Sequence, residues 1–80
     1  MNWTEEAVLE ALNGVLDPEF GRDVVTLGWV TINAVSEGQV DVTVKTGNPA
    51  MHARQRVEEA VQFALERAFG TDAQFAITVE

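Results

Sequence analysis

The sequence predicts an α+β fold, a two-layer α-β-β-α-β sandwich in which two helices cover one face of a three-stranded mixed sheet. Two segments repeat apolar residues with the 3.6-residue period of an amphipathic helix. Three shorter segments alternate apolar and polar residues, which is typical of half-buried strands. The 80 residues are 46% hydrophobic, so we expect residues 1–80 to form a single domain with a thin core.

The first helix is expected over residues 5–16. Thr4 is a suitable N-cap residue, and Trp3 occupies the position of a hydrophobic staple before it. Pro18 disfavours helical geometry in the residue before it, so the helix should end there. The helical period predicts a buried face made of Val8, Ala11, Leu12 and Val15.

The connection that follows, residues 17–28, combines turn-forming residues with apolar side chains. The apolar members are Phe20, Val24, Val25 and Leu27. A solvated loop does not need four such side chains, since burying them is what stabilises a fold. We therefore expect this segment to pack onto the body of the domain.

Two strands are expected over residues 29–35 and 39–45, joined by a tight turn in which Gly38 takes a positive φ. A last strand is expected over residues 74–79. It can lie parallel to the second strand, reached through a helical crossover, or antiparallel beside the first. The sequence alone leaves this strand order open.

The second helix has the clearest boundaries. Asn48 is a good N-cap residue, Pro49 a good first helical residue, and Gly70 a good terminator. Its apolar period predicts a buried face made of Ala53, Val57, Ala60, Val61, Ala64 and Ala68. Phe63 and Phe69 lie off this face, and together with Trp29 they are candidates for exposed aromatic side chains.

The net charge of −8 comes from thirteen acidic and five basic residues. Such a balance disfavours nucleic acids and anionic membranes as partners, because both are bound through Lys and Arg. The start of the chain lacks the pattern of a signal peptide, so we expect a cytoplasmic protein. The absence of cysteine leaves packing alone to hold the core.

Two carboxylates, Asp17 and Glu19, flank Pro18 at the end of the first helix. Such a pair can act as a general acid and base, or can bind a hard cation. The alternative is structural, with Asp17 accepting a hydrogen bond from a backbone amide while Pro18 breaks the helix. The residues alone favour this structural interpretation.

The loop before the second helix, residues 46–52, has no nucleotide-binding pattern, although a helix N-terminus can attract an anion. His52 is the only histidine, and with no cysteine near it we expect a solvated side chain rather than a metal ligand. Arg54 and Arg56 form the densest basic spot. They can recognise a carboxylate of a partner, or pair with neighbouring glutamates on the helix.

Three stretches, residues 15–19, 23–30 and 46–51, together resemble a known family. Their order and spacing are similar to the small domain of iron–sulfur assembly proteins such as SufT. The same domain is found in the PaaD protein of phenylacetate degradation and at the N-terminus of Mrp/ApbC-type iron–sulfur carrier P-loop ATPases. The stretch over residues 48–54 and the end of the second helix look most like the Mrp N-terminal domain.

The chain departs from this family at one position. The family commonly has a Pro-x-Cys-Pro arrangement before the second helix, and here Met51 stands in place of the cysteine, followed by His52. A thioether cannot be deprotonated and is a poor iron ligand beside a thiolate. Cysteine-based cluster binding and thiol chemistry are therefore excluded for this chain.

The resemblance implies a non-enzymatic accessory domain, the N-terminal part of a longer protein, that binds an ATPase domain in cis or a client apoprotein. The alternative is a stand-alone adaptor subunit of a metabolic complex, as in the PaaD branch. No cofactor or metal is expected in this chain, and the iron–sulfur cluster and ATP would belong to a fused or partner domain. The candidate partner-binding residues are Asp17, Glu19, Asn48, Met51, His52 and Arg54.

Overall fold

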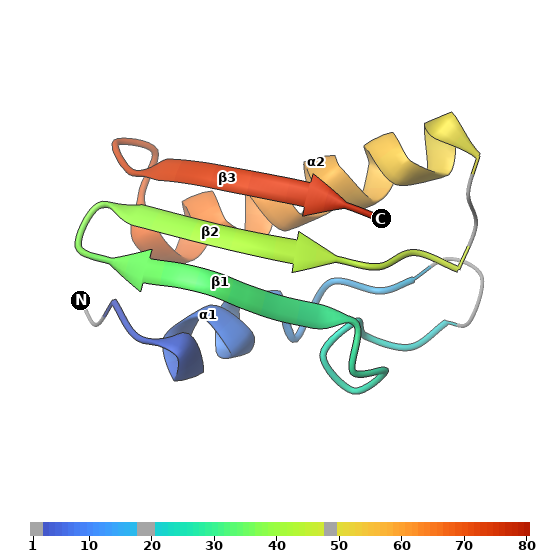
Figure 1. The fold of residues 1–80 in the computed structure, drawn as a ribbon, viewed down its shortest axis with the longest axis horizontal. Helices are drawn as coiled ribbons and strands as arrows, with labels where there is room; N and C mark the ends of the chain where they lie inside the picture. Colours follow the sequence, from blue (N-terminus) through green and yellow to red (C-terminus); the bar gives the residue numbers. More distant parts are fainter. Residues whose placement is uncertain (1–2, 18–20, 48–49) are drawn as a thin grey trace.

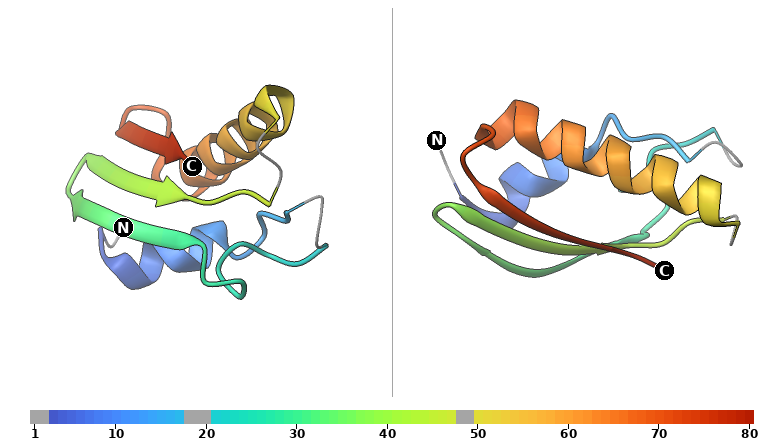
Figure 2. Two further views of the ribbon diagram at one scale, coloured as in Figure 1. Left: turned by 45° about the vertical axis from the view of Figure 1, so that its right-hand side comes forward. Right: turned by 90° about the horizontal axis from the view of Figure 1, so that it is seen from above.

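The structure, a computed structural model, describes residues 3–17, 21–47 and 50–80 (Figure 1). The elements follow the order α1 (Glu5–Leu12), β1 (Val30–Ser36), β2 (Gln39–Val44), α2 (Met51–Phe69) and β3 (Gln74–Val79). The strands form one sheet in the order β1-β2-β3, with β1 antiparallel and β3 parallel to β2. Both helices cover the same face of this sheet (Figure 2). The predicted two-layer fold is confirmed, and β3 takes the parallel placement of the two left open.

The core lies between the central strand β2 and the two helices. All three inward side chains of β2, Val40, Val42 and Val44, are fully buried. The helices and the connection after α1 supply the facing side chains, which are Val8, Leu12, Val15, Val24, Val57, Val61, Leu65 and Phe69. β2 is therefore paired with a strand on both edges and covered by the helices on one face, which places it at the centre of the fold.

Helix α1 begins where the sequence predicts, because the Thr4 side chain accepts a hydrogen bond from a first-turn amide at 3.1 Å. It ends at Leu12, however, and not at residue 16. Asn13 and Gly14 follow, both poor helix formers, and form a turn. Val15 still reaches the core from outside the helix.

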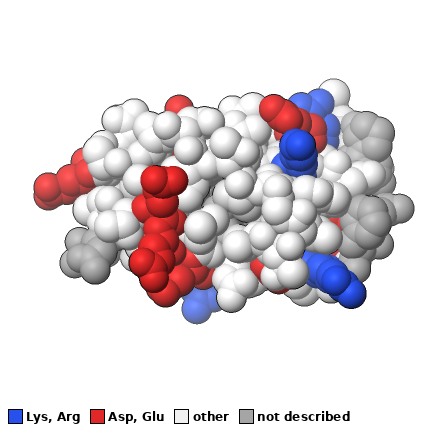
Figure 3. All heavy atoms as spheres, turned by 60° about the horizontal axis from the view of Figure 1, so that its bottom comes forward, with Lys and Arg blue, Asp and Glu red and all other residues white. Residues whose placement is uncertain are grey.

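Acidic side chains gather over α1 (Figure 3), whose first turn carries two glutamates.

Helix α2 begins at Met51, with Ala50 in the N-cap position and no side-chain cap. The prediction of an N-cap at Asn48 is therefore wrong, and both Asn48 and Pro49 lie outside the described residues. The predicted end is confirmed, since Gly70 follows the last turn with φ +92. No helix in the described part of the chain is long and apolar enough to cross a membrane.

The buried face of α2 differs from the predicted one. It consists of Ala53, Val57, Val61, Leu65 and Phe69, spaced by four residues throughout. Ala60 and Ala68 are exposed, and Phe69 is only 6% exposed. The helix buries the face with the larger side chains because they remove more apolar area from water than the alanines of the predicted face. Phe69 also stacks on Trp3, with ring centroids 4.7 Å apart.

The other face of the sheet is open and polar. Asn33 of β1 donates hydrogen bonds from Nδ2 to Asp41 Oδ1 at 3.2 Å and to Thr43 Oγ1 at 2.9 Å, both on β2. The register of β1 shifts between Ile32 and Ala34, which marks a β-bulge in this edge strand. Since these outward side chains are polar, this face can remain in water.

Candidate functional site

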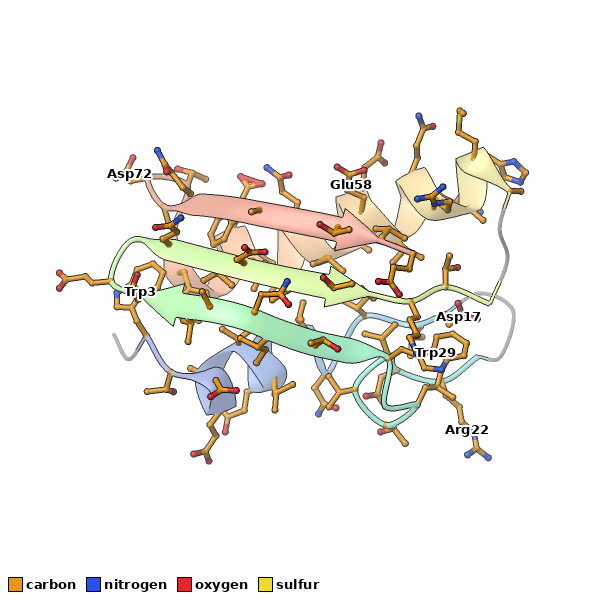
Figure 4. The ribbon with its side chains drawn as sticks, in the orientation of Figure 1. Trp3, Asp17, Arg22, Trp29, Glu58 and Asp72 are labelled. Carbon is orange, nitrogen blue, oxygen red and sulfur yellow. The ribbon has the colours of Figure 1, made fainter. Side chains whose placement is uncertain are left out.

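The chain after α1 folds back on itself at one end of the sheet. Val24 donates a backbone hydrogen bond to Val15 at 2.9 Å, and Asp17 donates one to Arg22 at 2.9 Å. Val24 is fully buried, which confirms that this segment packs onto the body of the domain. Figure 4 shows Asp17 beside Trp29 at this end, while Arg22 points away from the sheet.

Asp17 is the fully buried charged residue of the site. Its Oδ1 accepts a long hydrogen bond, 3.4 Å, from the backbone amide of Gly47, thirty positions along the chain. Its own backbone carbonyl accepts a hydrogen bond from the Gly21 amide at 2.8 Å. Asp17 thus accepts a hydrogen bond from a backbone amide, as the structural interpretation expected, although the amide lies far along the chain. The other part of that interpretation is wrong, because α1 ends at Leu12 and not at Pro18. The carboxylate joins the segment after α1 to the connection between β2 and α2.

A second carboxylate, Asp23, fixes the turn that leads into β1. Its Oδ2 accepts a hydrogen bond from the Thr26 amide at 2.8 Å. The Thr26 hydroxyl, and then the Thr26 amide, hold the pKa of the Asp23 carboxyl below its ordinary value of 3.8, because both stabilise the ionised form. Gly28 completes the turn with φ +73. Much of the motif over residues 23–30 therefore forms an ordered turn that leads into β1.

Arg54 holds the first part of α2 against the end of β3. Its Nη2 donates a hydrogen bond to the backbone carbonyl of Val79 at 2.6 Å. In the described part of the chain Arg54 makes no ion pair with the glutamates that follow it on the helix, which was one of the two expectations. The guanidinium instead positions α2 relative to the sheet.

Met51 and His52 occupy the first turn of α2 and are both exposed, Met51 to 75%. The expectation of a solvated histidine is confirmed. A hollow of about 320 Å³ lies beside Met51, and its lining consists of Met51, Arg54, Gln55, Glu58 and Val79. The described residues contain no group of three or more His, Cys, Asp or Glu side chains that could hold a metal ion.

The structure brings four of the six predicted site residues to one end of the molecule. Met51, His52 and Arg54 share the start of α2, and Asp17 contacts the loop before it. Glu19 and Asn48 lie outside the described residues.

Two residues that complete the site were not predicted. Gly47 and Val79 act through their backbone groups, so their residue types do not indicate these hydrogen bonds in the sequence. A larger hollow of about 560 Å³ lies elsewhere, between α1 and α2. Its lining contains no predicted site residue and consists of Ala11, Gly14, Val15, Leu16, Ala60, Phe63, Ala64, Arg67 and Ala68.

Comparison with known proteins gives a family and a fold. The sequence model of the family described as iron-sulfur cluster assembly protein matches residues 5–75. A solved structure of the domain of unknown function DUF59 from Bacillus anthracis superposes with a TM-score of 0.79 at 22% identity, over 95% of this chain and 73% of that one. No curated protein matches the sequence. The chain therefore belongs to the iron–sulfur cluster assembly protein family, as its SufT- and PaaD-like motifs predicted.

Proposed function

We propose that this chain is a non-catalytic, cytoplasmic interaction domain of iron–sulfur cluster assembly that binds a carrier ATPase domain or a client apoprotein. Membership of the family supports a role in cluster assembly. One observation carries the finer proposal: the Asp17–Gly47 hydrogen bond joins the segment after α1 to the loop before α2, which leads to the exposed Met51. By the resemblance, Met51 stands where the family commonly has a cysteine.

The donor atoms of this chain do not fit an iron–sulfur cluster. Protein ligands to such clusters are mainly cysteine thiolates, and the sequence has no cysteine. Met51 offers a neutral thioether, and His52 is the only histidine. We therefore treat the cluster as cargo passed between partners and assign no transfer step to this chain.

The positions of the ionisable side chains support a role without catalysis. The Asp17 carboxylate is fully buried and bonded to a backbone amide, so it cannot contact a substrate. A general base needs a positioned partner or substrate proton within hydrogen-bond reach. The His52 side chain has no hydrogen-bond or ion-pair partner within the described ranges of the chain.

The proposed contact surface is the first turn of α2. Within the described residues, only Leu16, Met51 and Phe63 are large hydrophobic side chains that are mainly exposed, and Met51 is exposed the most. A thioether side chain is flexible and polarisable, which suits it to adapt to a partner surface. Met51 and His52 would make the contact, while Asp17 and Arg54 would position the loop and the helix behind it.

The test compares two serine substitutions on the same helix. Met51→Ser should weaken binding to the carrier ATPase domain of the source organism by about tenfold, because an exposed apolar anchor is lost. Phe63→Ser is the matched control, since Phe63 is exposed to 63% on a distant part of α2. Isothermal titration calorimetry measures both affinities, and circular dichroism checks the fold. If Phe63→Ser alone weakens binding, the contact surface is the hollow between the helices and the proposal is wrong.

A further inference from the structure

We propose that the outer edge of β3 is a second docking site, which binds an extended, positively charged peptide segment of a partner protein. The inference goes beyond the surface at the start of α2 and rests on the strand itself. β3 lies at the edge of the sheet and pairs with β2 without interruption from Gln74 to Val79. The opposite edge of such a strand presents backbone groups that can pair with another strand.

The hydrogen bonds of β3 show which groups face outward. Gln74 donates its amide to the Gly38 carbonyl at 2.8 Å, in the turn before β2, and Glu80 donates its amide to the Val44 carbonyl of β2 at 2.9 Å. Residues with even numbers therefore point their backbone groups toward β2. The alternate residues, Phe75, Ile77 and Val79, must then direct their backbone groups away from the sheet. In the part of the chain that the structure describes, no other strand pairs with this edge.

Arg54 limits the length of the free edge. It occupies the outward carbonyl of Val79 with its 2.6 Å hydrogen bond. The outward backbone groups left to bind a peptide are the amide and carbonyl of Phe75, the amide and carbonyl of Ile77, and the amide of Val79. Such a row accommodates a short extended peptide in the manner of β-strand addition.

The two edges of the sheet differ in their protection. Proteins protect free edges with bulges, prolines or charged side chains, because a regular edge invites pairing with other chains. β1 carries a bulge between Ile32 and Ala34, whereas β3 has none. The sequence of β3, Gln-Phe-Ala-Ile-Thr-Val, contains no proline, glycine or charged residue. A regular and unprotected edge is what a strand-binding site requires.

The charges around this edge identify the occupant as basic. Asp72 precedes β3, Glu80 follows it, and Glu58 lines the hollow beside Val79; all three acidic side chains are exposed. Figure 4 shows Asp72 at one end of β3 and Glu58 on α2 alongside it. The nearby Arg54 is already engaged with the strand's own carbonyl. A peptide with Lys or Arg on both sides of a short apolar stretch matches this pattern.

A second copy of the chain fits the edge less well. Antiparallel pairing of two β3 strands would bring Glu80 of each copy toward the start of the other strand, where Asp72 lies. Each copy also carries a net charge of −8. Like charges at both ends of the pairing oppose self-association.

Amide hydrogen exchange followed by NMR tests the edge directly. In the free protein the amides of Phe75, Ile77 and Val79 should exchange much faster than those of Ala76 and Thr78. The probe is a synthetic peptide of alternating Val and Thr with two Lys at each end. Its binding should slow exchange at the three odd-numbered amides. The same peptide with Glu in place of Lys should not bind.

A matched pair of variants isolates the backbone group. Ile77→Pro and Ile77→Ala both remove the isoleucine side chain, but only proline removes the outward amide. Ile77→Pro should bind the probe peptide about tenfold more weakly than Ile77→Ala. If the proline variant does not fold, a peptide N-methylated at every residue replaces it, and this peptide should fail to bind the unmodified protein.

Three results would overturn the proposal. One is slow exchange at all β3 amides in a free monomer. Another is equal binding by the Lys- and Glu-flanked peptides, or by the plain and N-methylated ones. The third is a dimer in sedimentation that protects the odd-numbered amides, which would assign the edge to a second copy.

Discussion

At the scale of single residues, the site depends on one buried carboxylate. A carboxylate loses its hydration when it is buried, and this cost is offset only where hydrogen bonds replace the water. Asp17 meets this condition through the Gly47 amide, and no buried side-chain nitrogen or oxygen atom of the described residues lacks a partner. The same bond joins Asp17 to the loop that leads to Met51, so this contact contributes to both stability and surface geometry.

Removing this carboxylate should lower stability and loosen the loop. Asp17→Ala leaves the Gly47 amide without its acceptor, and we expect the free energy of unfolding to fall by about 1–3 kcal/mol. Asp17→Asn retains an oxygen of the same shape and should lose less. Urea denaturation measures the stability, and hydrogen exchange at Gly47 reports the loop. An alanine variant as stable as the original chain would show that the contact contributes little.

The residue-level predictions succeeded where a side chain carries the signal. The sequence predicts that Asp17 accepts a hydrogen bond from a nearby backbone amide, and it does accept one from an amide, but from Gly47, thirty positions away. Gly47 and the carbonyl of Val79 were missed, because backbone partners are set by tertiary contacts over thirty and twenty-five positions. The exposure of Met51 likewise depends on where α2 meets the sheet.

At the scale of elements, hydrophobic period predicted every helix and strand, and tertiary packing corrected their details. The start of α1 and both ends of β3 were predicted correctly. The buried face of α2 was not, because two apolar stripes compete on this helix and only contact with the sheet decides between them. Phe69 belongs to the stripe that is buried.

The stacking of Trp3 on Phe69 should couple the N-terminal segment to the far end of α2. Trp3→Leu and Phe69→Leu should each destabilise the domain, and the double variant should lose less than the sum of both by about 0.5–1.5 kcal/mol. Phe63→Leu serves as the control, with an expected change within about 0.5 kcal/mol because its side chain is exposed. Chemical denaturation measures all four variants. Strictly additive losses would argue against a stacking contribution.

At the scale of the whole molecule, the mixed sheet was predicted but its strand order was not. Both placements of the last strand satisfy its alternating pattern, and only the length and packing of α2 bring β3 beside β2. Whether the natural protein continues into a carrier ATPase stays a prediction. It depends on the likeness of residues 48–54 to the Mrp N-terminal domain.

An antibody raised against the domain distinguishes a domain fused to an ATPase from a stand-alone adaptor. On immunoblots of source cells, we expect a band far above the 8.7 kDa of this chain, because the likeness to the Mrp N-terminal domain implies a fused ATPase domain. A band at 8.7 kDa would instead favour the stand-alone adaptor. Its partners would then be sought among metabolic complexes.

The position of β3 has a consequence for how the domain is made. Its partner strand β2 is central, so the core cannot close until the segment Gln74–Val79 has been synthesised and has left the ribosome. Until then Val40, Val42 and Val44 sit on a hairpin with one unpaired edge, open to other chains. Folding therefore waits for this strand, and the nascent chain is most vulnerable to aggregation before the strand has emerged.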